Sequence, residues 1–474
     1  MEKGKVISNF IWRFSERCGA KLVSFVVSIV LARLLEPSVY GTVALFTVFT
    51  TILQVFIDSG LGTALIQKKN ADDLDYSSVF YFNFVVCIIL YLGMFIAAPY
   101  IAKFYGNMSL IPVIRVISLT LIISGVKNIQ QAYVSSNMLF KRFFFSTIGG
   151  TIVSAFVGIF MAYIGMGVWA LVAQQLSNAM IDTTILWITV KWRPKAVFSW
   201  ERLKSLLAYG WKLLVAVLLD TVYNNLRNLV IGKMYSSADL AFYNQGDKFP
   251  KIIVTNINTS IDSVLLPTMS SEQDNKARVK EMTRRAIKTS TYIMAPLMMG
   301  LAFCAKTVVE LVLTQKWLPC VPFLQIFCIT YMFYPVHTAN LNAIKAMGRS
   351  DIFLKLEIIK KIVGMSLLLS TMWFGVMAMA YSLLVSCVLS QIINSWPNKR
   401  LLEYGYLEQL RDLIPGVILA VIMGICVYFI GYINLPNIIV LIIQVIVGAT
   451  IYIVMSIVFR LESFLYLWNM VKTY

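Results

Sequence analysis

The first long apolar segment, residues 8–37, reads SNFIWRFSERCGAKLVSFVVSIVLARLLEP. Its length and its Ile, Leu, Phe and Val content predict a helix that crosses a bilayer, since about 20 apolar residues span the hydrocarbon. Its first half nevertheless carries Arg13, Glu16, Arg17 and Lys21. At about 100° per residue, these side chains fall within an arc of about 140°. One face can therefore contact lipid while the other faces a polar interior, where charges at membrane depth normally lie.

Apolar segments of similar length recur along the rest of the chain. Of its 474 residues, 59% are hydrophobic and 14% are charged, and the mean hydropathy is +0.76. Soluble proteins are about 45–50% apolar and about 25% charged. We therefore expect an all-α polytopic membrane protein. The formal net charge of +18 fits Lys and Arg gathered in cytoplasmic loops better than a nucleic-acid-binding surface, so no nucleic acid partner is expected.

The apolar segments predict about 14 transmembrane helices, because each approaches the roughly 20 residues that cross a bilayer. The expected ranges are 10–34, 39–58, 77–99, 110–132, 143–164, 168–190, 209–233, 248–268, 286–313, 319–343, 352–374, 377–396, 410–432 and 435–459. The amino-terminal MEKGKVISNF lacks the features of a cleavable signal peptide, so the first helix is expected to be retained. The seven Cys show no metal-ligand spacing, so we expect free buried thiols and no metal site.

Basic residues in the loops predict the orientation. Lys and Arg occur at the amino terminus and after each even-numbered predicted helix up to the twelfth, whereas the opposite loops hold little beyond Lys103 and Lys316. Since cytoplasmic loops carry the excess of Lys and Arg, both termini are expected to be cytoplasmic. The loops are too short for a soluble catalytic domain. We therefore predict that the protein is not an enzyme, has no catalytic residues, and acts inside the membrane.

A weak internal repeat divides the chain. Residues 31–45 read LARLLEPSVYGTVAL, and residues 231–245 read IGKMYSSADLAFYNQ. In both stretches an apolar helix ends at a basic residue, a short polar turn follows, and a small residue opens the next helix. The layout predicts two pseudo-symmetric six-helix lobes that rock around a central site. The expected parts are an N-terminal lobe at 1–200, a C-terminal lobe at 201–400, and two further helices with a cytoplasmic tail at 401–474.

Polar side chains at membrane depth occur in corresponding helices of both halves, which predicts a shared hydrophilic cavity. In residues 212–234, Asp220, Asn224, Arg227 and Asn228 fall within an arc of about 100°. Arg and Lys at such positions suit phosphate or pyrophosphate, and the cationic candidates are Arg13, Arg17, Lys21, Lys127 and Arg227. The candidates for cavity polarity or ion coupling are Glu16, Asp58, Asp220, Asn224 and Asp262. For His337, an interior histidine satisfied by its neighbours is favoured over a proton relay.

Several stretches together resemble the Wzx-type polysaccharide flippases of the multidrug/oligosaccharidyl-lipid/polysaccharide exporter superfamily. They are ARLLEPSVYGTVALFTVF at 32–49, IDSGLGTALIQKK at 57–69, GMGVWALVAQQL at 165–176, KWRP at 191–194 and VLLPTMS at 264–270. The resemblance implies a lipid-linked oligosaccharide flippase of the bacterial inner membrane, which moves undecaprenyl-pyrophosphate-linked glycan units by alternating access. It implies membrane lipid, a polysaccharide polymerase and chain-length machinery as further partners. It implies no cofactor beyond a coupling Na⁺ or H⁺.

Three other functions stay open at this point. A lipid II flippase would have the same substrate chemistry with a different sugar, and charge alone does not exclude it. A MATE-like exporter of cationic drugs shares the expected fold, but it would favour an acidic or aromatic cavity, whereas the first predicted helix is basic. An integral membrane polymerase or ligase would need a sizeable outside loop with catalytic residues, and the sequence offers no such loop.

Overall fold

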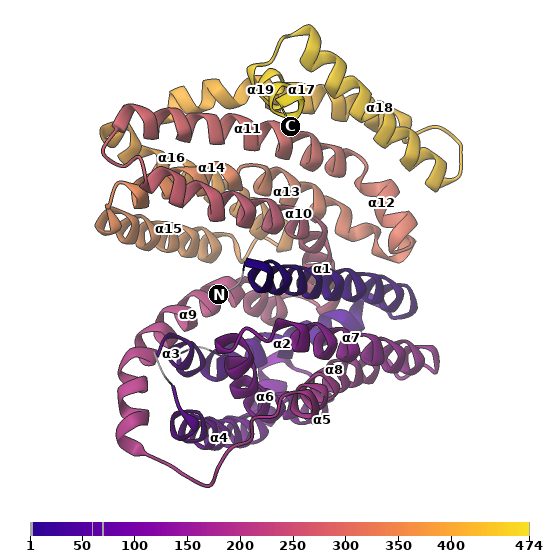
Figure 1. The fold of residues 1–474 in the computed structure, drawn as a ribbon. Helices are drawn as coiled ribbons and strands as arrows, with labels where there is room; N and C mark the ends of the chain where they lie inside the picture. The colour runs from indigo at the N-terminus through magenta and orange to yellow at the C-terminus, as the bar shows by residue number, and fades with distance from the viewer. Residues whose placement is uncertain (1–2, 59, 69–70, 474) are drawn as a thin grey trace. The chain divides into compact units, whose positions relative to one another are not determined.

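A computed structural model describes the chain at residues 3–58, 60–68 and 71–473, apart from the side chains of 3–11, 13–18, 209, 470–471 and 473. Figure 1 shows that the described part is built of helices. They are α1 (Lys3–Leu34), α2 (Pro37–Asp58), α3 (Leu61–Gln67), α4 (Asp73–Tyr105), α5 (Leu110–Ile117), α6 (Leu119–Ser136), α7 (Phe140–Tyr163), α8 (Val168–Thr189), α9 (Trp200–Met234), α10 (Ser237–Ser270), α11 (Lys276–Phe303), α12 (Ala305–Val312), the 3-10 helix η1 (Gln315–Cys320), α13 (Val321–Met332), α14 (Tyr334–Ala346), α15 (Ser350–Thr371), α16 (Val376–Leu401), α17 (Tyr406–Ile430), α18 (Asn437–Val458) and α19 (Glu462–Thr473).

Each predicted membrane span lies on one helix of the structure or on consecutive helices. Within the described residues, 9 helices are long and apolar enough to cross a membrane, or up to 10 if the bent pair α11–α12 is one span. Helices α8, α10 and α15 do not meet this criterion, and each carries several polar or charged side chains within its length. An all-α multi-pass membrane fold is confirmed, while the count of 14 stays a prediction.

The order of elements and turns repeats along the chain. The fourth predicted span is broken in both halves, at Ser118 between α5 and α6 and at Phe333 between α13 and α14. The turn before the fifth span contains a left-handed residue in both, Met138 with φ 53° and Gly348 with φ 72°. Helix α7 then packs along α8, and α15 along α16. The repeat inferred from the first two helices of each half therefore extends through the sixth.

Small residues allow close packing between α7 and α8, which lie side by side in the first half (Figure 1). A Cβ atom on Gly158 would lie 2.9 Å from the Gln174 Cβ, and one on Gly150 would lie 3.0 Å from the Asp182 Cβ. Because lipid tails are as apolar as Leu, membrane helices associate through such close packing rather than through the hydrophobic effect. The two glycines therefore let α8 present its polar side chains at a fixed distance from α7.

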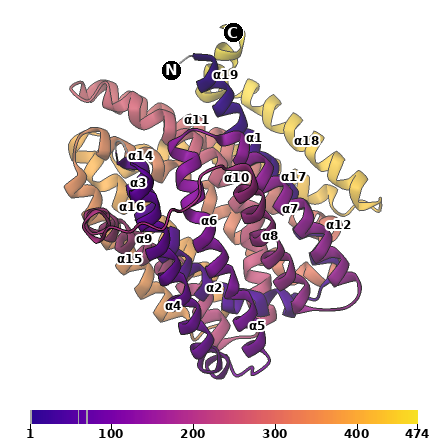
Figure 2. The same cartoon turned by 60° about the horizontal axis from the view of Figure 1, so that its bottom comes forward.

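Contacts divide the chain into two compact units, Met1–Ala241 and Phe242–Tyr474. Figure 2 shows α9 beside the early helices of its own unit, and α9 packs on α2, α3 and α4. The division thus falls in the first turns of α10, later than the lobe boundary predicted at residue 200. The predicted lobes describe a sequence repeat, whereas the units describe packing, so the lobe boundary stays a prediction.

A backbone contact inside the first unit depends on Gly41. A Cβ atom added at Gly41, near the start of α2, would lie 1.6 Å from the carbonyl oxygen of Ser237. It would also lie 2.9 Å from the Ser237 Cα. These distances are far below van der Waals contact, so the α1–α2 and α9–α10 turns meet here only because residue 41 has no side chain.

We predict that Gly41→Ala lowers the thermal unfolding temperature of the detergent-solubilised protein. Overpacking costs about 1–3 kcal/mol, and the better helix propensity of Ala returns at most about 1 kcal/mol. The matched control is Gly93→Ala in α4, where a Cβ atom would meet nothing within 4 Å. The control should melt at or above the wild-type temperature. A Gly41→Ala protein that melts with the wild type would show that the contact does not contribute to stability.

Candidate functional site

A polar cluster inside the first unit joins α2, α6 and α8. The Lys127 Nζ lies 2.8 Å from the Asp182 Oδ2, and these side chains are 23% and 9% exposed. On α2, the Asp58 Oδ1 accepts hydrogen bonds from Asn128 Nδ2 at 3.1 Å and from Gln54 Nε2 at 3.0 Å. Gly62 makes room for this amide, because a Cβ atom there would lie 3.0 Å from the Asn128 Oδ1. Three spans are thereby linked by polar side chains.

The two carboxylates of this cluster, Asp58 and Asp182, have different kinds of partner. Asp182 is neutralised by Lys127, as a charge at membrane depth requires. Within the described residues, Asp58 has no ion pair within 4.0 Å and is held by neutral amides on one oxygen. Its side chain reaches the surface of the unit. Asp58 is therefore the carboxylate of this cluster that is available to a proton or a small cation.

The other predicted residues are placed as follows. Asn224 donates to Asp220 at 2.9 Å on the exposed face of α9, and Arg227 is half-buried on the same helix. Lys21 is exposed on α1, and Asp262 is exposed on α10 in the second unit. The side chains of Arg13, Glu16 and Arg17 lie outside the described residues. The structure thus brings Asp58 and Lys127 into one cluster, and it places Asp220, Asn224 and Arg227 along one helix.

His337 in α14 has a neighbour at each ring nitrogen. Asn394 Nδ2 lies 3.1 Å from Nδ1, and Cys387 Sγ lies 3.3 Å from Nε2. An amide that donates to Nδ1 leaves the proton on Nε2, which gives a neutral tautomer. This arrangement agrees with the expected interior histidine satisfied by its neighbours.

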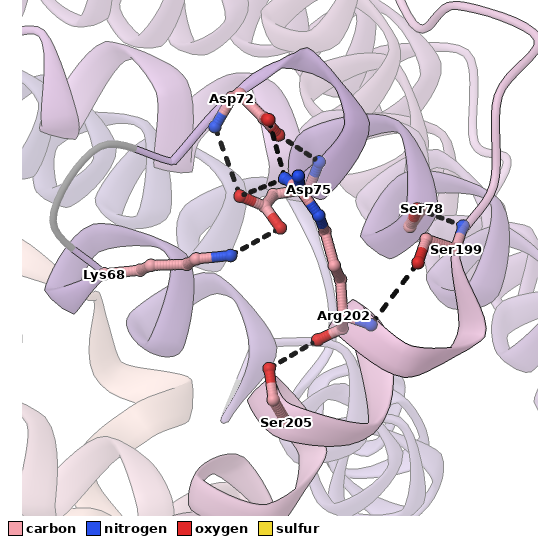
Figure 3. A network of polar contacts seen from close by, with 7 residues as sticks. All are labelled: Lys68, Asp72, Asp75, Ser78, Ser199, Arg202 and Ser205. Atoms are coloured by element: carbon pink, nitrogen blue, oxygen red, sulfur yellow. Dashed lines mark hydrogen bonds and ion pairs between the residues drawn. The ribbon is translucent and has the colours of Figure 1, made fainter.

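Sequence reasoning missed a second polar centre, the Asp75 cluster of Lys68, Asp72, Asp75 and Arg202 (Figure 3). Asp72 and Asp75 form a capping box at the start of α4. The side chain of Asp75 is 0% exposed, and its Oδ1 lies 2.6 Å from the Lys68 Nζ. Arg202, near the start of α9, lies 2.6 Å from Asp72 and 3.5 Å from Asp75. The Asp72-x-x-Asp75 spacing is a helix-start signal that could have located it.

The segment before α9 is fixed to the same end of α4. Main-chain N–H groups of Lys195 and Ser199 donate to Ser77 Oγ at 3.0 Å and Ser78 Oγ at 2.9 Å. The Trp192 indole donates to Asp73 at 3.1 Å. These contacts, together with the Asp75 cluster, hold the connection between α8 and α9 against the first turns of α4 (Figure 3).

Comparison with known proteins identifies the family. A family model described as polysaccharide biosynthesis protein matches residues 30–322. The chain belongs to this family. The match begins near the end of α1 and extends to the start of α13. It therefore includes the α1–α2 and α9–α10 turns, which correspond in the repeat, and the polar cluster around Asp58 and Lys127.

Curated relatives are similar to the chain over most of its length. It is 23% identical over 388 residues to the teichuronic acid biosynthesis protein TuaB of Bacillus subtilis, covering 80% of this chain and 79% of that protein. It is 22% identical over 373 residues to the lipopolysaccharide biosynthesis protein WzxC of Escherichia coli, covering 77% of this chain and 74% of the relative.

Solved structures share the fold. The inward closed conformation of the lipid II flippase MurJ matches with a TM-score of 0.75 at 13% identity, covering 95% of this chain and 99% of that one. An inward-facing MATE family multidrug resistance transporter of the MOP superfamily matches with a TM-score of 0.64 at 16% identity, covering 86% and 98%. The sequence identities are low, so these likenesses establish the architecture.

The Lys127–Asp182 pair predicts a specific stability pattern. Lys127→Met should destabilise the protein by about 3 kcal/mol or less, because it leaves a largely buried carboxylate without its cation. Lys127→Met combined with Asp182→Leu should recover much of the loss, since no unpaired charge remains. Thermal unfolding of the single and double variants measures this coupling.

The control for this cycle is Arg349→Met, which breaks an exposed pair with Asp351 and should cost about 1 kcal/mol or less. A double variant no more stable than the Lys127→Met protein would show that the pair is not what the single substitution disrupts.

The Asp75 cluster predicts a pH dependence. The main-chain N–H of Asp75 and the side chain of Arg202 lower the pKa of Asp72 from its ordinary value of 3.8 to about 2. A lowered carboxyl pKa contributes stability that is present above the ordinary value and is lost as pH falls through the folded-state value. The contribution should therefore fade between about pH 4 and pH 2.

Asp72→Asn is the informative variant, because Asn can still cap α4 but does not titrate. Hydrogen exchange of the first turn of α4 should show faster exchange in the variant than in the wild type near pH 5, with the difference vanishing toward pH 2. Asp274→Asn, in an exposed turn, is the control. A constant difference at all pH values would contradict the assignment.

Proposed function

We propose that this protein is a flippase that moves undecaprenyl-pyrophosphate-linked oligosaccharide units across the bacterial cytoplasmic membrane for surface polysaccharide assembly. The observation that carries the proposal is the family match over residues 30–322. The relatives TuaB and WzxC are named for teichuronic acid and lipopolysaccharide biosynthesis. A lipid II flippase has the same fold, and lipid II flipping and the proposed reaction both move a glycan on a lipid carrier.

Flipping requires that an anionic head group cross the hydrocarbon in a polar environment. Arg side chains suit pyrophosphate, because a guanidinium offers several fixed donors and keeps its charge. In the proposed mechanism, the head group binds the basic face of α1, with Arg13, Arg17 and Lys21, and Arg227 on α9. The lipid tail stays in the bilayer. No covalent bond changes, so the mechanism uses no nucleophile or acid–base pair.

The paired state of Lys127 modifies this assignment. With its ammonium 2.8 Å from Asp182, Lys127 carries a charge that is already compensated by a carboxylate. Its contribution to binding is therefore smaller than that of an unpaired cation. Asp58, with two amide donors and an exposed side chain, is the leading candidate of the first unit for Na⁺ or H⁺ coupling. Glu16, Asp220, Asn224 and Asp262 are the remaining candidates.

The location and partners follow from the same proposal. The alternating Lys and Arg content of the loops supports cytoplasmic termini in the inner membrane. A protein that delivers repeat units to the outer leaflet would supply a polysaccharide polymerase and its chain-length machinery. The transport step itself is not enzymatic.

We predict that Arg17→Ala and Arg227→Ala each reduce flipping without preventing membrane insertion, because each removes a donor and a charge for the pyrophosphate. The loss should exceed about tenfold in the double variant, since one hydrogen bond to a charged group contributes about 1.5–3 kcal/mol. The measurement is the rescue of surface glycan in a deletion strain, with immunoblots for membrane content. Arg400→Gln, at the exposed end of α16, is the control. Full activity in the double variant would remove both residues from the site.

Deletion of the gene tests the function as a whole. Completed undecaprenyl-pyrophosphate oligosaccharide should accumulate on the inner leaflet while surface glycan disappears. Loss of drug resistance with normal surface glycan would instead indicate a cation exporter. Accumulation of single repeat units on the outer leaflet would indicate a polymerase and overturn the proposal.

A further inference from the structure

Two adjoining basic cavities lie in the second unit, where α11 meets α17 and the start of α19. Their volumes are about 230 and 280 Å³, far above the roughly 10–15 Å³ that holds one water. Both are lined by Lys288 of α11 and by Glu462 and Ser463 of α19. We call the first of them, which Arg411 and Arg460 also line, the α11–α17–α19 pocket.

The carboxylates of this region already have cations. Asp412 accepts two hydrogen bonds from Arg284, at 2.7 and 2.8 Å. Lys288 lies 2.6 Å from Glu462 and 3.2 Å from Asp412, and it holds the pKa of Glu462 below its ordinary value. The acidic side chains are thus charged and neutralised within the region. They do not balance any further cation in the pocket.

Two guanidinium groups of the pocket, those of Arg411 and Arg460, have no acidic partner among the described residues. Among the residues that the structure describes, neither the Arg411 nor the Arg460 side chain has a hydrogen-bond or ion-pair partner, and both are exposed. Each offers several donors in a fixed plane, the geometry that matches the oxygens of a phosphate. The pocket therefore carries an uncompensated positive charge beside a cluster that is otherwise neutralised.

The backbone at Arg460 is left-handed, as it is at Met138, and it fixes where this side chain leaves the end of α18. Arg460 directly follows the C-cap residue of α18 and has φ 49°. The N–H groups of Arg460 and Leu461 close the helix end by bonding the carbonyls of Ile457 and Ser456. Glycine is the usual residue at this left-handed position. An Arg there gives up stability that Gly would provide, so Arg460→Gly can remove the guanidinium without a cost to the helix end.

The surroundings of the pocket predict a position at the membrane surface. It lies at the start of the candidate span α17 and just beyond the end of the candidate span α18. Large apolar side chains beside it are exposed, including Leu407, Val458 and Phe459. Helix α19 adds exposed Tyr466 and Trp468, the aromatic residues that gather at the level of lipid head groups. A ligand here would have acyl chains beside it and a charged group in the pocket.

We propose that the α11–α17–α19 pocket binds the phosphate of an anionic phospholipid in the leaflet that the basic loops predict to be cytoplasmic. Arg411 and Arg460 hold the phosphate, and the acyl chains lie on the exposed apolar side chains of α17 and α18. The lipid joins three helices at their common end and orients α19 on the membrane surface. The site does not depend on the proposed flippase activity.

Native mass spectrometry of the full-length protein, with phosphatidylglycerol or phosphatidylcholine added, tests the site. The wild type should retain at least one phosphatidylglycerol more tightly than phosphatidylcholine. Removing each guanidinium should weaken retention about fivefold, as expected for one basic residue at an anionic surface. The variants are Arg411→Gln, Arg460→Gly and their combination. Arg400→Gln removes one charge at another predicted cytoplasmic helix end and should leave retention unchanged.

Arg460→Gly keeps the test independent of folding, because Gly suits the left-handed position and should preserve or raise the unfolding temperature. Wild-type retention of phosphatidylglycerol in the combined variant would overturn the proposal. Equal retention of both lipids by the wild type would overturn it as well. Displacement of the lipid by millimolar inorganic phosphate would identify a site for a soluble anion and would also refute a lipid site.

Discussion

The hydrocarbon of a bilayer offers no partner to a polar group, and this constraint decides where the polar residues of this protein lie. Each described charge at membrane depth must be paired, hydrogen-bonded or turned toward a polar space. Asp182 is paired with Lys127, and Asp58 is held by amides from its own helix and from α6. Such links fix the lateral packing of α2, α6 and α8 more specifically than apolar contacts do, because the lipid provides an equally good apolar neighbour.

The same constraint explains what could be predicted from the sequence. Span positions, the all-α class and the repeat follow from long apolar runs and from turns with recognisable residues, and the structure has a helix at every predicted span. The family was also recognisable, because stretches such as ARLLEPSVYGTVALFTVF keep their order and spacing. A helical wheel predicts that Asp220 and Asn224 share one face of their helix, and in the structure a hydrogen bond joins them.

Pairing partners far apart in the sequence could not be predicted in this way. The sequence shows that Lys127 is a charged residue inside a predicted span. It does not show that Asp182 of α8 lies opposite to it. Lys68 and Arg202 are among the loop charges that predict the orientation. In the folded chain both form ion pairs with the buried Asp75. The place of Arg460 in the pocket could not be predicted, because no sequence pattern shows that its backbone is left-handed. These features depend on packing between helices, for which a single sequence has no direct marker.

The last part of the connection between α8 and α9, residues 195–199, is fixed to α4 through two main-chain N–H groups. The N–H groups of Lys195 and Ser199 reach Ser77 and Ser78, whereas the side chains of residues 195–198 are exposed. The side chains of residues 196–198 are thus free to vary in evolution, since none is needed for the two bonds. Its length is not free, because two anchored N–H groups must meet two neighbouring hydroxyls on one helix. Across relatives, this stretch should accumulate substitutions while excluding insertions and deletions.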